Sequence, residues 1–90
     1  MELEIQHQDN GQQGRFFIEK QYQCVAFLSY VYLNETMINA DHTFVDVSLR
    51  NQGVGDKLIQ ALRHFIDEKN LKLKASCGYV AAKLRKELAE

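Results

Sequence analysis

Length, composition and charge describe a small single domain. The chain has 90 residues, 46% of them hydrophobic and 26% charged, with a formal net charge of −1. One hydrophobic core fits in a chain of this size, so we expect a single domain over residues 1–90. The small net charge excludes bulk attraction to nucleic acid or to anionic membranes, and we expect neither as a partner.

The sequence shows no targeting or membrane segment and no metal motif. No apolar run approaches the roughly 18 residues that cross a bilayer, and the first residues lack the basic start of a signal peptide. The two cysteines, Cys24 and Cys77, have no metal-ligand spacing. We therefore expect a cytoplasmic protein with free thiols and no metal site.

Alternating residues predict four strands in the first half of the chain. The first is expected around residues 3–6, and the turn-forming stretch QDNGQQG (8–14) separates it from a second strand at 15–19. Residues 24–33 are apolar on both faces, which predicts a central strand covered on both sides, with Cys24 in the core. The fourth strand is expected at residues 37–45.

Strict alternation in the fourth strand sets the predicted faces of its side chains. It places His42 and Phe44 on the apolar face with Ile38 and Ala40, and Asp41 on the opposite face with Asn39 and Thr43. A β-bulge would turn His42 to the other face.

The period changes to that of a helix in the second half. Apolar residues at helical spacing begin at Val54, and Asn70 is suited to a left-handed cap. Residues 71–76 alternate as a strand. A second amphipathic helix begins near residue 78, with Val80, Leu84 and Leu88 inward. The sequence predicts an α+β fold of order β-β-β-β-α-β-α, mostly antiparallel, in which the last strand can lie parallel to the fourth.

Two glycines stand at the start of the first helix, in the stretch LRNQGVGDKL (49–58). The first amides of a helix lack internal partners and carry positive potential, and glycine lets a phosphate approach them. A Rossmann fingerprint would need a third glycine where Leu58 stands, and a P-loop would need Gly-Lys-Ser/Thr. The remaining pattern, R-x-x-G-x-G, fits either a phosphate-binding loop or a purely structural turn.

The same stretch resembles motif A of the GCN5-related N-acetyltransferases, the Arg/Gln-x-x-Gly-x-Gly/Ala loop. DHTFVDVSLRNQGVGDKLIQAL followed by LKLKASCGYV also resembles the small, single-domain acetyltransferase-like group called the YjdJ type, over roughly residues 36–82. The resemblance implies acetyl-CoA as co-substrate. It also implies a coenzyme site built from the strand end, the glycine loop and the second helix: Phe44, Val45, Arg50, Asn51, Gln52, Gly53, Val54, Gly55 and Tyr79.

Four side chains are candidates for the chemistry that this resemblance implies. Cys77 ends a strand just before a helix, where it can carry an acetyl group or simply pack as a small apolar residue. His42 can deprotonate an amine or serve as a core histidine, and Asp41 can orient substrate or be solvated. Tyr79 can line the cleft and protonate the leaving thiolate, or pack in the core.

Two functions of different classes fit the sequence. The first is transfer of an acetyl group from acetyl-CoA to an amine or protein acceptor, directly or through Cys77. The second is a non-catalytic module that binds CoA or a protein partner, because the chain lacks the early helices and late strands that build the acceptor site in longer members of the family. We expect a monomer or a weak homodimer, since a small sheet exposes its edge strands.

Overall fold

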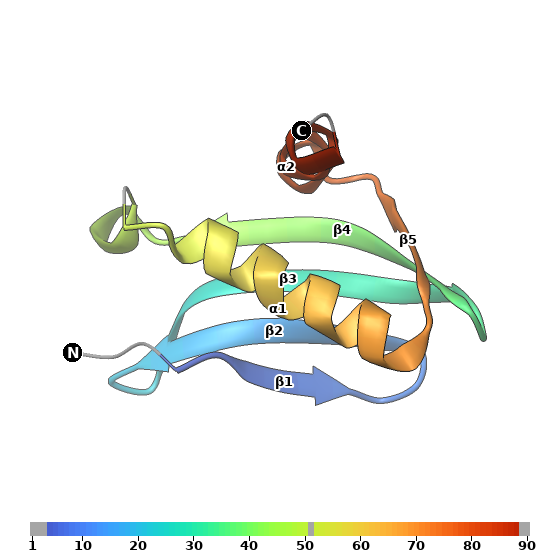
Figure 1. Ribbon diagram of the computed structural model, residues 1–90. Coiled ribbons are helices and arrows are strands. Elements are labelled where there is room, and N and C mark those ends of the chain that lie inside the picture. The colour runs from blue at the N-terminus through green and yellow to red at the C-terminus, as the bar shows by residue number, and fades with distance from the viewer. Residues whose placement is uncertain (1–3, 51, 89–90) are drawn as a thin grey trace.

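The structure is a computed structural model that describes residues 4–50 and 52–88, with side chains described up to residue 83. It contains five strands, a short 3₁₀ helix and two α-helices (Figure 1). In chain order these are β1 (Gln6–Asp9), β2 (Gln13–Lys20), β3 (Gln23–Asn34), β4 (Met37–Val45), η1 (Val47–Leu49), α1 (Val54–Lys69), β5 (Lys72–Ala75) and α2 (Gly78–Leu88).

The strands form one sheet in the order β1-β2-β3-β4-β5. The first four strands form an antiparallel meander, and β5 pairs parallel to β4 after the crossover through α1. The predicted fold class, element order and parallel last strand are thus confirmed. The left-handed cap of α1 at Asn70 is confirmed as well, with φ of 56°.

The hydrophobic core lies between α1 and one face of the sheet. Tyr30, Leu28 and Ile38 from the sheet and Leu58 and Leu62 from α1 are fully buried there. Val80 of α2 is also buried, as predicted, whereas the predicted inward positions Leu84 and Leu88 lie outside the described side chains.

The other face of the sheet is more open than the sequence predicts. Phe27 of the central strand is half-buried on that face and Phe44 is 39% exposed, so β3 is not covered equally on both sides. Cys24 is also exposed instead of buried in the core. It is the second residue of β3, next to the β2–β3 turn, and it pairs with Glu19 where the register shifts.

A bulge in β4 corrects the predicted faces of that strand. Ser29 pairs with His42 while Tyr30 pairs with Ala40, so Asp41 is the extra residue without a partner across the ladder. An extra residue reverses the alternation beyond it. His42 and Phe44 therefore lie on the open face, and the prediction that they share the apolar face with Ala40 is wrong.

The first strand lies later in the chain than the predicted range of 3–6. The apolar Leu3 and Ile5 suggested the early position, but pairing begins at Gln6. The strand is held to the sheet by Asp9, whose carboxylate accepts hydrogen bonds from the hydroxyls of Tyr30 at 2.6 Å and Tyr32 at 2.7 Å. This long-range contact explains why an otherwise polar segment pairs.

The position of His7 beside this cluster predicts a pH effect on stability. The ring stacks on Phe16 at 4.1 Å, and burial lowers the pKa of His7, an effect that Asp9 only partly opposes. Because the folded-state pKa lies below that of the unfolded chain, the free energy of unfolding falls as pH drops below the ordinary value of 6.5. His7→Gln, which keeps a donor for the Tyr30 hydroxyl without titrating, should flatten the pH dependence of the melting temperature between pH 7 and 5.

The matched control for this variant is His64→Gln, since the His64 side chain is 83% exposed on α1. It should leave the slope as in the wild type. An unchanged slope in His7→Gln would show that other groups set the pH dependence.

Candidate functional site

The parallel strands β4 and β5 separate after the pair Ala40–Ala75, and the candidate site lies where they separate. The backbone amides of Ser76 and Cys77 both donate to the carbonyl of Ala40, at 3.0 and 3.2 Å, which ends the β4–β5 ladder. The chain then turns into α2, while β4 runs on to Val45. Figure 1 shows α1 across the front of the sheet and α2 beyond the β4 edge, so the end of β4 runs between the two helices.

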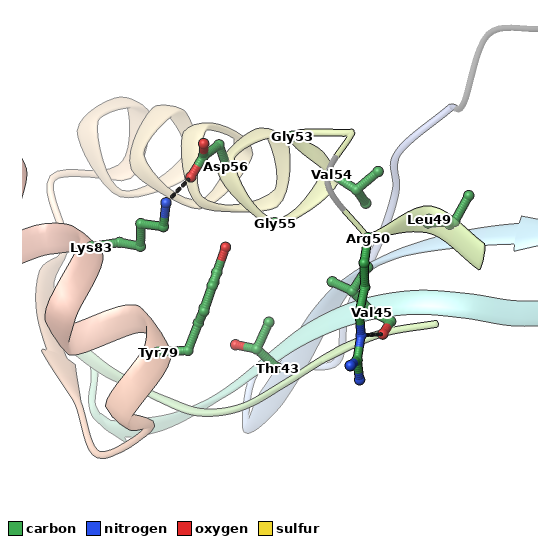
Figure 2. Close-up of a pocket in the computed structure, with 10 residues that line it drawn as sticks. All are labelled: Thr43, Val45, Leu49, Arg50, Gly53, Val54, Gly55, Asp56, Tyr79 and Lys83. Atoms are coloured by element: carbon green, nitrogen blue, oxygen red, sulfur yellow. Dashed lines mark hydrogen bonds and ion pairs between the residues drawn. The ribbon is translucent and has the colours of Figure 1, made fainter. Parts of the chain in front are cut away.

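A pocket of about 550 Å³ lies in this gap. Its walls come from the end of β4, the loop after η1, the first turn of α1 and the first two turns of α2 (Figure 2). Pockets of a few hundred to about 1,000 Å³ are typical of small-molecule sites. Since the walls come from segments far apart in the sequence, the pocket is a product of the fold.

Glycine is favoured at positions 53 and 55, at the start of α1, for two different structural reasons. Gly53 precedes the helix with φ of 73°, a left-handed conformation that other residues rarely adopt, and a Cβ there would meet open space. Gly55 is buried in the first turn, and a Cβ on it would collide with the Tyr79 hydroxyl. In Figure 2 the Tyr79 ring reaches from α2 toward this turn. One glycine thus shapes the loop, and the other admits a tyrosine from the facing helix.

The charges around the pocket favour an anion. Lys83 of α2 forms an ion pair with Asp56 of α1 at 2.9 Å, so the acidic side chain of the first helical turn is already matched (Figure 2). Arg50 adds a second cation, held along the strand end by a hydrogen bond from its Nε to the carbonyl of Val45 at 3.4 Å. The positive end of the α1 dipole lies at the same wall. Two cations and a helix N-terminus therefore outweigh one carboxylate.

The free edge of β4 presents backbone groups to the pocket. The amide of Asp46 donates to the carbonyl of Val25 in β3, and alternate residues along a strand point their backbone groups to opposite sides. Phe44 therefore directs its amide and carbonyl toward β3, whereas Thr43 and Val45 direct theirs toward the gap left by β5. Both Thr43 and Val45 line the pocket.

Cys77 lies directly behind Thr43 and immediately before α2. Its Sγ is 3.5 Å from Thr43 Oγ1, and its side chain is half-buried. Burial raises the pKa of the Cys77 thiol, but hydrogen bonds from the Thr43 hydroxyl and from the amides of Val80, Tyr79 and Thr43 outweigh this, so the pKa lies below its ordinary value. The sulfur thus sits where donors favour a thiolate, beside the pocket lining and not in it.

The other predicted site residues are placed as follows. Val45, Arg50, Gly53, Val54, Gly55 and Tyr79 line the pocket together. Gln52 is exposed in the loop, where its amide donates to the carbonyl of Ser48 at 3.1 Å, and Asn51 lies outside the described residues. His42 and the Phe44 side chain are on the opposite face of the sheet, where both rings contact Phe27.

Sequence reasoning did not select four of the pocket residues: Thr43, Leu49, Asp56 and Lys83. Lys83 follows Tyr79 by one helical turn, so a helical wheel places them on one face. Thr43 precedes Val45 by two residues and therefore shares its face. These spacings are visible in the sequence, but the position of the bulge, which places Thr43 and His42 on opposite faces, is not.

Comparison with known proteins identifies the family. A family model described as GCN5-related N-acetyl-transferase matches residues 15–89. Comparison with curated protein sequences gives no match. Among solved structures, a GCN5-like protein from Staphylococcus aureus, described as a candidate N-acetyltransferase, is 37% identical with a TM-score of 0.75. The match covers 94% of this chain and 80% of the S. aureus chain.

Larger enzymes share the fold. An aminoglycoside acetyltransferase from an uncultured soil metagenomic sample is 22% identical with a TM-score of 0.66, over 87% of this chain and 58% of that one. The aminoglycoside N-acetyltransferase AAC(6')-Iy in complex with CoA is 18% identical with a TM-score of 0.62, over 88% of this chain and 60% of that one. This chain thus spans about three fifths of these two enzymes. The family match and the similarity to the S. aureus protein together show that the chain belongs to the GCN5-related N-acetyltransferases.

Proposed function

We propose that this protein transfers an acetyl group from acetyl-CoA to an amine, with the coenzyme held in the pocket between α1 and α2. The observation that carries the proposal is the convergence at one pocket of a helix N-terminus, two cations and a free strand edge. Membership of the N-acetyltransferase family supports the choice of coenzyme. None of the described helices is long and apolar enough to span a membrane.

The start of α1 would hold the diphosphate. The amides of Val54, Gly55 and Asp56 belong to the first turn of the helix and have no carbonyl one turn earlier to bond. Open space around Gly53 leaves room for an anion beside them. Arg50 and Lys83 would add charge-assisted contacts from either side.

The free edge of β4 would hold the pantetheine arm. Thr43 and Val45 face the gap with their backbone groups, and an extended amide-containing chain can pair there as an added strand if it replaces the hydrogen bond from Arg50 Nε to the Val45 carbonyl. This places the thioester beside Thr43, next to Cys77. Phe44, which the family resemblance assigned to the coenzyme site, is not part of this edge, because its backbone points toward β3.

Cys77 would accept the acetyl group. Its thiolate attacks the thioester carbonyl carbon and forms a new carbon–sulfur bond, while the bond from that carbon to the coenzyme sulfur breaks. The coenzyme leaves as a thiolate, which takes a proton, and the Tyr79 hydroxyl in the pocket is a candidate donor. A neutral amine then attacks the carbonyl carbon of acetyl-Cys77, so that a carbon–nitrogen bond forms and the bond to the cysteine sulfur breaks. The Cys77 thiolate is released, and the proton of the amine passes to the Tyr79 phenolate.

His42 can act only on an acceptor that approaches from the open face of the sheet. It is exposed there, next to the bulge at Asp41, whose carboxylate accepts a hydrogen bond from Ser29 at 2.7 Å. An imidazole at this place could take the proton of an incoming amine. Direct transfer from the coenzyme to the amine would use the same base and bypass Cys77.

A second candidate function is a module that binds CoA without turnover. The chain spans only about three fifths of the larger enzymes that share its fold. Incubation with acetyl-CoA and a panel of amines, with free CoA measured by chromatography, distinguishes the two functions. Release of CoA only when an amine is present supports the enzyme, and tight binding without release supports the module.

The diphosphate site predicts a charge effect at Gly53. Asparagine and aspartate both tolerate a left-handed conformation and differ little in shape. Gly53→Asp should weaken CoA binding at least about tenfold relative to Gly53→Asn, because a carboxylate beside the diphosphate costs on the order of 1.4 kcal/mol or more. Calorimetric titration of both variants with CoA measures the ratio of their dissociation constants. Equal affinities would show that this loop is a structural turn and not a diphosphate site.

The position of Cys77 predicts a covalent intermediate. Protein mixed with acetyl-CoA in the absence of an amine should gain one acetyl group, located on Cys77 by peptide mass spectrometry. Cys24→Ser should retain the modification and Cys77→Ser should lose it, since Cys24 lies on the exposed β2–β3 hairpin. Turnover without an acetyl-cysteine, undiminished in Cys77→Ser, would instead establish direct transfer.

A further inference from the structure

The side chain of Thr43 lies between the pocket and Cys77. It follows the Asp41 bulge in β4, so its side chain points to the helix side of the sheet while the neighbouring His42 points to the open face. Thr43 lines the pocket, and its hydroxyl is 3.5 Å from the sulfur of Cys77, a residue 34 positions later in the chain. It therefore connects the pocket to the thiol behind it.

We propose that Thr43 is a positioning residue for Cys77, whose hydroxyl holds the sulfur at the pocket edge and stabilises its ionised form. The proposal rests on the assignment of Cys77 as the acetyl acceptor. A threonine hydroxyl can both donate and accept a hydrogen bond. It accepts the S–H of the neutral thiol, and after ionisation it turns to donate its own proton to the thiolate.

The groups around the Cys77 sulfur differ in whether they can respond to its ionisation. The amides of Thr43, Tyr79 and Val80 also donate to the sulfur, but they are fixed in the backbone and can only donate. The pocket beside the sulfur carries the titratable side chains Tyr79 and Lys83 of α2, Asp56 of α1 and Arg50, and Lys83 is ion-paired with Asp56. His42 of β4 faces away. The Thr43 hydroxyl is thus the side-chain group that follows the ionisation of Cys77.

The bulge makes this contact possible. If β4 were regular, with Asp41 paired in the ladder, alternation would put Thr43 on the open face and His42 on the helix side. The same bulge sets the free backbone edge at Thr43 toward the gap. The side chain of Thr43 thereby contacts Cys77, and its backbone faces the expected path of the thioester.

The test measures the ionisation of Cys77 without coenzyme or turnover. In a Cys24→Ser background, the rate of alkylation by iodoacetamide is followed from pH 5 to 10. Thr43→Val removes the hydroxyl at nearly constant shape and should move the midpoint of the profile up by about one pH unit, as expected for loss of a hydrogen bond to a charged group. Thr43→Ser keeps the hydroxyl and should give the profile of the parent protein.

Thr43→Ala is a second variant without the hydroxyl. Its alkylation midpoint should match that of Thr43→Val, which controls for any effect of the valine side chain on packing. Unfolding curves of all three variants establish that they are folded. Equal midpoints in the parent, valine and alanine proteins would overturn the proposal, as would a serine variant that shifts as far as valine. Since alkylation needs no acetyl-CoA, this outcome is separate from a failure to detect acetyl-Cys77, which would overturn the covalent route alone.

Discussion

The parting of β4 and β5 after the Ala40–Ala75 pair is the constraint on which the site depends. Two amides of the departing chain converge on the Ala40 carbonyl, which ends the ladder and sends the chain into α2. The end of β4 is left with backbone groups that face a gap. In water such groups are solvated, but between two helices they form a polar edge in a pocket about 550 Å³ in volume. A coenzyme with an extended, amide-containing arm is well suited to that edge.

The pocket has positive potential at one end, and the Cys77 thiol lies just outside its lining near Thr43. At one end, the first turn of α1 and Arg50 offer positive potential, and Lys83 matches the one carboxylate. At the other, the start of α2 and Thr43 surround Cys77 with donors. Each end thus uses a helix N-terminus, and the strand edge joins them. Two larger acetyltransferases share this fold, and the chain spans about three fifths of their length.

Local patterns predicted much of this architecture, because element order, the helix cap at Asn70 and the glycine turn depend on neighbours in the sequence. The features that were missed depend on contacts between distant segments. The bulge at Asp41 follows from cross-strand pairing, and β1 is placed by hydrogen bonds to Asp9. Cys24 is exposed next to the β2–β3 turn, where the pairing of the two strands shifts register. The fit of Tyr79 against Gly55 is likewise a tertiary contact, invisible in the spacing of the motif.

The central claim is that the coenzyme lies along the β4 edge with its diphosphate at the start of α1. A titration of ¹⁵N-labelled protein with CoA, followed by amide chemical shifts, tests this most directly, with pantetheine, which lacks the diphosphate, as the comparison. The account predicts that CoA moves the amides of Thr43, Val45 and residues 54–56, and that pantetheine moves only the first two. Shifts confined to the far end of the sheet around His7 and Asp9, or no saturable shifts at all, would contradict it.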